Sequence, residues 1–374
     1  MKKTLHSFVK EYSERNKNQH CTAVYSVTNS QGFVPSTEYF SKEVYSKDLS
    51  TYKIVKNGMI AYNPSRINVG SVAVQRVAEQ VIVSPLYVVF EVDKKELLPE
   101  YISYFLHSDI GFSQIAMNTS GSVRDSLKFN ALQKIEINVY SVEEQKKIVD
   151  KLQRLETIIL KRHTVLEKYE DLVKSQFIEV FGDVVKNDKS WNCLPMTTAA
   201  PISAYKGNIE STEGKYWLLN LDMVEAQTGD IISHVMVELN EVGVSTVAFN
   251  QENVLYSKLR PYLNKVVNPK IAGYATSELI PLKPNKEYLN KVFFTALLRS
   301  DAFVNYIQEQ VAGAKMPRVS MGVFRQFDVI CPPIDLQNQF AAFVEQTDKS
   351  KFRIKQSLEK LEKCYKALLQ KYFG

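Results

Sequence analysis

The chain contains an internal repeat, which limits its possible folds more than any other feature of the sequence. A shift of 192 positions aligns the later part of the second half with that of the first, without a gap from Gly121 onward. The aligned identities are Gly121 with Gly313, Gln145 with Gln337, Leu166-Glu167-Lys168 with Leu358-Glu359-Lys360, and Phe181-Gly182 with Phe373-Gly374. Nearer the start of each copy the offset is 194, which aligns Tyr62 and Arg66 with Tyr256 and Arg260. The sequence therefore predicts two copies of one unit, over residues 1–182 and 183–374.

Each copy ends in a heptad pattern. From Ile148 and from Phe340, mostly apolar residues recur in alternating steps of four and three, the spacing of a coiled-coil seam. We assign the following seam positions to a helix or partner interface: Leu152, Leu155, Ile159, Leu166, Tyr169, Ile354, Leu358, Leu361 and Tyr365. The pattern predicts helices over 148–182 and 337–374, and Gly182 is a natural end for the first. Because an apolar stripe needs a partner, we expect an antiparallel coiled coil; the alternative is that each helix packs on its own lobe.

The remaining residues of each copy predict a mixed globular lobe. Alternating or β-branched stretches predict strands at Val72–Val77, Val81–Val92, Val244–Phe249 and Asn253–Tyr256, and apolar periodicity predicts helices at Leu97–Leu106 and Leu289–Arg299. The expected fold class is α+β, with two similar lobes separated by two long helices. The predicted domains are lobe 1 over 1–147, a central helix over 148–182, lobe 2 over 183–336 and a C-terminal helix over 337–374.

The sequence offers no catalytic or metal-binding pattern. The four cysteines lie far apart without a CxxC pair or a histidine at zinc-ligand spacing, so we expect neither a metal nor a disulfide framework. The five histidines are scattered and have no companions that we can identify at catalytic spacing. The first residues are basic but no apolar run follows, and no window reaches 18 apolar residues. We therefore expect a non-catalytic cytoplasmic protein without a membrane partner.

Basic side chains gather in loop-like segments at equivalent places in the two copies. One pair of segments is 119–128 and 312–320, where glycine allows close approach to a phosphate and arginine or lysine supplies the charge. The other pair is 62–66 and 256–262, in which Arg66 and Arg260 share one position. Two lobes that carry such segments fit an extended partner, and double-stranded DNA is the obvious one. The candidate DNA-contacting residues are Arg66, Arg124, Lys128, Lys258, Arg260, Lys315 and Arg318.

The net charge limits how DNA can be bound. The chain carries 47 basic and 41 acidic residues, a formal net charge of +6, and the two predicted helices account for most of this excess. The lobes together are nearly neutral. Binding by the lobes must therefore use a localised basic face rather than overall charge.

The chain resembles the specificity subunit of a type I restriction-modification system. The likeness lies in residues 133–137 with 143–148, in residues 327–333 with Gln337, in Phe181-Gly182-Asp183, and in the segment 254–261. The resemblance implies two target-recognition domains, each reading one half of a split DNA sequence, with paired helices that fix the gap. It also implies that the helices dock adenine-methyltransferase subunits and, through them, a nuclease and translocase subunit. S-adenosylmethionine, ATP and Mg then belong to those partners.

One departure from the family concerns the end of the first lobe. The second copy has Pro332-Pro333 before its helix, the form that the family usually shows, whereas the first has Tyr140-Ser141. We therefore expect a looser junction between lobe 1 and its helix.

Two other classes of function compete with DNA recognition. A two-lobed coiled-coil adaptor that binds only proteins has the same repeat, and salt-sensitive DNA binding distinguishes the two. An enzyme in its own right requires that the purified chain alone cut or modify DNA.

Overall fold

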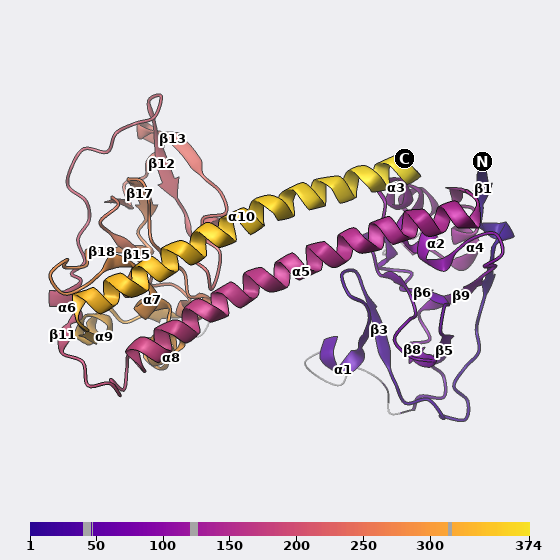
Figure 1. Ribbon diagram of the computed structural model, residues 1–374, viewed down its shortest axis with the longest axis horizontal. Coiled ribbons are helices and arrows are strands. Elements are labelled where there is room, and N and C mark those ends of the chain that lie inside the picture. The colour runs from indigo at the N-terminus through magenta and orange to yellow at the C-terminus, as the bar shows by residue number, and fades with distance from the viewer. Residues whose placement is uncertain (40–45, 47, 120–125, 313–315) are drawn as a thin grey trace. The chain divides into compact units, whose positions relative to one another are not determined.

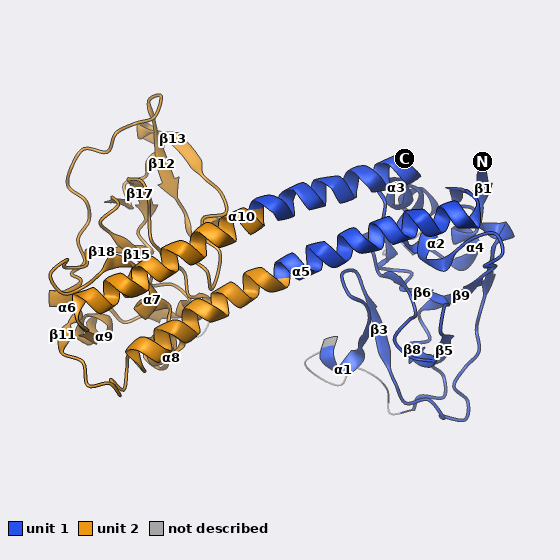
Figure 2. Cartoon of the chain, viewed as in Figure 1, with its two compact units in different colours: residues 1–163, 356–374 blue, residues 164–355 orange. Residues whose placement is uncertain are grey.

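The computed structural model describes residues 1–39, 46, 48–119, 126–312 and 316–374. These residues form two compact units (Figure 2). Unit 1 comprises Met1–His163 with Gln356–Gly374, and unit 2 comprises Thr164–Lys355. Two uninterrupted helices of 40 residues, α5 (Val142–Phe181) and α10 (Ile334–Phe373), each contribute to both units (Figure 1).

Unit 1 is a mixed lobe built on a four-stranded antiparallel sheet of order β2-β9-β6-β7. Besides its parts of α5 and α10, its elements are β1 (Lys2–Thr4), η1 (Leu5–Ser7), β2 (Val9–Glu11), β3 (Tyr25–Thr28), β4 (Gly32–Pro35), α1 (Ser36–Tyr39), β5 (Lys53–Lys56), β6 (Ile60–Tyr62), η2 (Ile67–Val69), β7 (Val72–Val74), β8 (Gln80–Val83), β9 (Val88–Val92), α2 (Pro99–Leu106), α3 (Asp109–Asn118), α4 (Phe129–Leu132) and β10 (Glu136–Asn138).

The main core of unit 1 includes the end of α10. Phe373 packs on Tyr101 of α2, with ring centroids 5.0 Å apart, and it shares one cluster with Ile148 and Leu152 of α5. Leu152 is fully buried, although it lies on a helix that is mostly polar. The final turns of α10 therefore complete the hydrophobic core of lobe 1.

Unit 2 repeats this plan with a three-stranded antiparallel sheet of order β16-β15-β18 and a four-stranded mixed sheet of order β13-β12-β17-β14. Besides its parts of α5 and α10, its elements are β11 (Cys193–Pro195), α6 (Met196–Ala199), β12 (Lys215–Leu219), η3 (Leu221–Met223), β13 (Val235–Glu238), η4 (Leu239–Glu241), β14 (Thr246–Phe249), β15 (Val254–Ser257), η5 (Pro261–Leu263), β16 (Val266–Val267), β17 (Gly273–Thr276), β18 (Leu279–Leu282), α7 (Lys291–Arg299), α8 (Asp301–Glu309), β19 (Val311–Ala312), β20 (Arg318–Val319), α9 (Met321–Gln326) and β21 (Asp328–Ile330).

The core of unit 2 receives the end of α5 in the same way. Phe181 packs on Phe293 of α7 with ring centroids 4.6 Å apart, and Phe177 and Phe340 complete the aromatic cluster. Phe181 and Phe293 are the repeat equivalents of Phe373 and Tyr101 in unit 1. Each lobe is thus joined to the beginning of one long helix and to the end of the other.

A buried glutamine holds the junction between each lobe and its helix. The Gln145 amide donates to the carbonyls of Glu96 and Tyr140, and its Oε1 accepts from the Leu98 N–H at 2.9 Å.

Gln337 makes the same three hydrogen bonds in the second copy. Its amide donates to the carbonyls of Tyr288 and Pro332, and its Oε1 accepts from the Asn290 N–H at 2.8 Å. Both glutamine side chains are fully buried. The first junction thus makes the same three hydrogen bonds as the second without a double proline, and these contacts give no sign of the looser junction that we expected.

The predicted strands and helices are present, but some bounds differ: β7 covers only Val72–Val74, and β14 only Thr246–Phe249. The stretch Val81–Val92 forms two strands, β8 and β9, because the Ser84–Tyr87 turn with Pro85 interrupts it. The long helices also begin earlier than the heptads, at Val142 and Ile334. The first helix ends as predicted, since Gly182 follows with φ +76° and donates its N–H to the Ile178 carbonyl.

Candidate nucleic-acid interface

The structure joins the two predicted DNA-contacting segments of lobe 2 into one surface. The Val319 N–H donates to the Lys258 carbonyl at 2.9 Å, and the Arg260 N–H donates to the Pro317 carbonyl at 2.8 Å. Leu259 and Arg318 face each other as an antiparallel bridge. We call residues 256–262 with 316–320 the lobe 2 face.

Lobe 1 joins its two segments by the equivalent bond. The Leu127 N–H donates to the Pro64 carbonyl at 3.1 Å, and the Tyr62 hydroxyl donates to the Leu127 carbonyl. In the repeat alignment this backbone bond is the counterpart of the one between Val319 and Lys258. We call residues 62–66 with 126–128 the lobe 1 face, and the two faces share one backbone scaffold.

A short helix follows the paired arginine in both faces. Arg66 precedes η2, which ends at Gly70 with φ +90°, and Arg260 precedes η5, which ends at Asn264 with φ +49°. Arg260 itself adopts φ +49°, a left-handed conformation that costs a side-chain-bearing residue about 1–2 kcal/mol. The side chain of Arg260 is therefore presented by a backbone conformation that the surrounding fold must stabilise.

The predicted contact residues are largely accessible to a ligand. Arg66, Lys128, Arg260 and Arg318 are exposed, and Lys258 is half-buried. Arg124 and Lys315 lie outside the described residues, so their place on the faces stays a prediction. Four basic side chains thus remain available to solvent on the two faces.

Arg318 has a carboxylate partner that no pattern in the sequence indicates. Its Nη2 donates to Glu278 Oε1 at 3.0 Å, and Glu278 lies in the turn between β17 and β18. The Glu278 carbonyl accepts from the Lys258 N–H, so this turn belongs to the lobe 2 face. No periodicity connects residues 40 positions apart, and for this reason sequence reasoning missed the pair.

The side chains assigned to the helix interface are shielded from solvent, either fully or in part. All nine assigned side chains are buried or half-buried: Leu152, Leu155, Ile159, Leu166, Tyr169, Ile354, Leu358, Leu361 and Tyr365. Within unit 1, Tyr365 of α10 donates its hydroxyl to Glu156 of α5 at 2.6 Å. Within unit 2, Lys351 of α10 forms an ion pair with Glu170 of α5. The two helices therefore contact each other inside each unit.

A carboxylate between two tyrosines ties lobe 1 to both helices. Glu156 accepts hydrogen bonds of 2.6 Å from Tyr365 and from Tyr104 of α2. Burial, together with the neighbouring carboxylate, raises the pKa of both phenols above the ordinary value. Both hydroxyls thus remain protonated donors to Glu156.

The equivalent place in unit 2 is open. Ala296, Val173 and Asp348 are the repeat counterparts of the two tyrosines and the carboxylate, and all three line a cavity of about 670 Å³. Each of these three side chains is smaller than its counterpart in unit 1, which leaves room for the cavity. This cavity lies against the helices rather than on the lobe 2 face.

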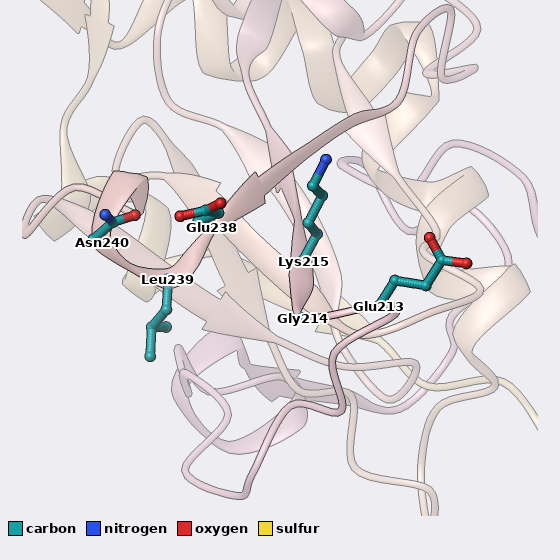
Figure 3. A pocket seen from close by; sticks show the side chains of 6 residues that line it. All are labelled: Glu213, Gly214, Lys215, Glu238, Leu239 and Asn240. Carbon is teal, nitrogen blue, oxygen red and sulfur yellow. The ribbon is translucent and has the colours of Figure 1, made fainter.

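A second, shallower pocket of about 330 Å³ lies on the β12–β13 hairpin (Figure 3). Its lining carries Lys215 together with the carboxylates of Glu213 and Glu238. Two carboxylates beside one lysine disfavour a phosphate. This pocket is therefore no candidate for contact with the DNA backbone.

The described residues contain no group of three His, Cys, Asp or Glu side chains placed to hold a metal ion. Within the same ranges, no helix is both long and apolar enough to cross a bilayer. All four cysteines are free.

Comparison with known proteins shows what the first part of the chain is similar to. Residues 7–168 match the family described as the type I restriction modification DNA specificity domain. Residues 7–168, which are less than half of the chain, resemble a type I DNA specificity domain. This match confirms the resemblance inferred from the sequence, and it includes the whole lobe 1 face.

Two similar proteins align over most or all of the chain. The type I restriction enzyme EcoDI specificity subunit of Escherichia coli is 20% identical over 311 residues, covering 73% of this chain and 69% of the relative. The solved type I restriction-modification S subunit from M. genitalium is 15% identical, with a TM-score of 0.58 over 100% of this chain and 96% of that one.

A second similar structure comes from work on complex assembly and conformational transition of a type I restriction-modification system. It is 13% identical, with a TM-score of 0.57 over 100% of this chain and 97% of the other. At such identities the structural likeness establishes the fold alone. The individual contact residues stay predictions.

Proposed function

We propose that this chain is the DNA sequence-specificity subunit of a type I restriction-modification complex. Lobe 1 (1–147) and lobe 2 (183–336) each read one half of a bipartite DNA site. The observation that carries the proposal is the duplicated face: one backbone scaffold, present in both lobes, presents Arg66 and Lys128 in one and Arg260 and Arg318 in the other. Its side chains differ between lobes, as two different half-sites require.

The long helices act as the spacer between the half-sites in this proposal. We infer that α5 and α10 pair as an antiparallel coiled coil. The contacts within each unit support this direction, because Phe373 at the end of α10 joins lobe 1 and Phe181 at the end of α5 joins lobe 2. At about 1.5 Å per residue, helices of this length span roughly 60 Å.

The chain has no catalytic role in this proposal, and chemistry belongs to its partners. Adenine-methyltransferase subunits dock on the helices and bring S-adenosylmethionine. Restriction and translocase subunits bring ATP and Mg. The setting is the cytoplasm.

The proposal is tested by reconstitution with the adenine-methyltransferase subunit that it requires as a partner. The complex is titrated with its methylated motif and with a scrambled duplex at several salt concentrations. The proposal predicts tighter binding to the motif, weakening steeply as salt rises. Equal affinity for both duplexes, or no DNA binding, would contradict it and favour the protein-binding adaptor.

A further inference from the structure

The lobe 2 face contains a paired guanidinium and carboxylate that has no equivalent among the described residues of the lobe 1 face. The side chain of Arg318 is 51% exposed, whereas that of Glu278 is 22% exposed and lies beneath the contact. The second carboxylate oxygen, Oε2, is fully buried and has no hydrogen-bond partner in the part of the chain that the structure describes. Burying a carboxylate oxygen without a hydrogen bond costs free energy of folding. Stability alone therefore does not explain why Glu278 occupies this position.

The internal repeat provides a control for this pair. Strand register places Tyr62 opposite Val88 and Tyr256 opposite Ile280, so Leu86 is the lobe 1 counterpart of Glu278. Leu86 is 80% exposed. The repeat alignment places Ser126 opposite Arg318.

Both members of the pair therefore change together between the lobes, while the backbone bond beneath them is retained. A purely structural ion pair has no reason to be confined to one copy of a shared scaffold. An ion pair that serves recognition has a reason to occur in one lobe alone, because the two lobes read different half-sites. This step rests on the proposed function.

The geometry also indicates which task Arg318 performs. One guanidinium nitrogen is bound to Glu278, which fixes the plane of the group and neutralises part of its charge. A phosphate needs mainly positive charge, whereas a guanine base presents two acceptors, O6 and N7, that require an oriented fork. We propose that Glu278 is a positioning residue that holds Arg318 for a bidentate contact with one guanine in the half-site of lobe 2.

The test uses the complex of this chain with its methyltransferase, after its methylated motif has been mapped. Each guanine of the motif is replaced in turn by 7-deazaguanine, which lacks the N7 acceptor, and binding is measured. The wild-type complex should lose about tenfold in affinity at one guanine of one half-site. Arg318→Ala and Glu278→Leu should each weaken binding to the unmodified site and lose this sensitivity at that guanine.

Two control variants keep the test specific. Glu252→Gln makes a similar charge change at the other end of β15, where the carboxylate pairs with Lys283 and Lys286, and it should retain the full sensitivity. Leu86→Ala alters the counterpart position in lobe 1 and should leave the sensitive guanine of lobe 2 unchanged. Fluorescence of Trp191 and Trp217, both in unit 2, verifies that the lobe 2 variants are folded.

Other results would overturn the proposal. If Glu278→Leu retains the tenfold sensitivity, the carboxylate does not position Arg318. If no guanine is sensitive and Arg318→Ala weakens all duplexes equally, Arg318 contacts a phosphate. A complex that shows no preference for its motif at all would refute the proposed function itself, and this outcome is separate from the other two.

Discussion

The buried glutamine at each lobe–helix junction supports a quantitative prediction. Gln337→Leu preserves approximate size but removes three hydrogen bonds, leaving the Asn290 N–H and the carbonyls of Tyr288 and Pro332 without this partner. A net contribution of about 1 kcal/mol for each bond predicts a loss of about 3 kcal/mol in the free energy of unfolding of unit 2. With a urea dependence of about 2 kcal/mol per molar, the midpoint should fall by about 1.5 M.

Tryptophan fluorescence can measure this loss in one unit alone. The chain has two tryptophans, Trp191 and Trp217, and both lie in unit 2. Gln145→Leu removes the same three bonds in unit 1, so it should leave the fluorescence transition in place and shift part of the circular dichroism transition instead.

Two results would refute this reasoning. A fluorescence midpoint that falls by less than about 0.3 M in Gln337→Leu would show that the junction bonds contribute little stability. An equal fall in Gln145→Leu would show that the two units unfold as one, and the assignment of each junction to its own unit would be wrong.

Four further predictions follow from other contacts. Arg260→Ala should weaken binding to the cognate duplex by about 1–3 kcal/mol if it contacts a base edge, and a titration at fixed salt checks this. Leu166→Asp or Leu358→Asp places a charge in the covered stripe and should reduce co-purification with the methyltransferase; an unchanged yield would count against the spacer. Tyr104→Ala removes a partly buried ring at the joint of lobe 1 and should cost about 2–3 kcal/mol, measured by denaturation. Hydrogen bonds from two lysines lower the pKa of Glu252 to about 2, below the ordinary 4.5. The ionised Glu252 therefore stabilises the folded protein above pH 4.5, and this stabilisation should be lost as the pH falls toward 2. Because the side chain is partly exposed, the stabilisation is at most about 1 kcal/mol. Glu252→Gln should abolish this pH dependence in an acid titration.

Much of the architecture follows from the repeat and the heptads. The repeat predicts two similar lobes, and every assigned seam residue, from Leu152 to Tyr365, is covered in the structure. The earlier helix start at Val142 also had a sequence signal, since Ser141 and Glu144 have capping-box spacing and the Glu144 N–H donates to the Ser141 hydroxyl at 3.2 Å.

The candidate faces were predictable only in part. Equivalent positions in the repeat identified Arg66 and Arg260, because an internal copy acts as a comparison within one chain. The contact of Arg318 with Glu278 was not predictable, because a β-turn and a distant short strand meet only through the sheet register. Sequence periodicity indicates which face of a helix or strand a residue occupies. It does not indicate which residues of distant segments come into contact.

The central claim is that this chain selects the DNA sequence on which its complex acts. The most direct test is a genome-wide map of methylated adenines with and without this gene in the source organism. The account predicts that one bipartite motif with a constant gap loses its methylation on deletion and regains it on complementation. Identical maps in an organism that expresses the chain and its methyltransferase would contradict the claim.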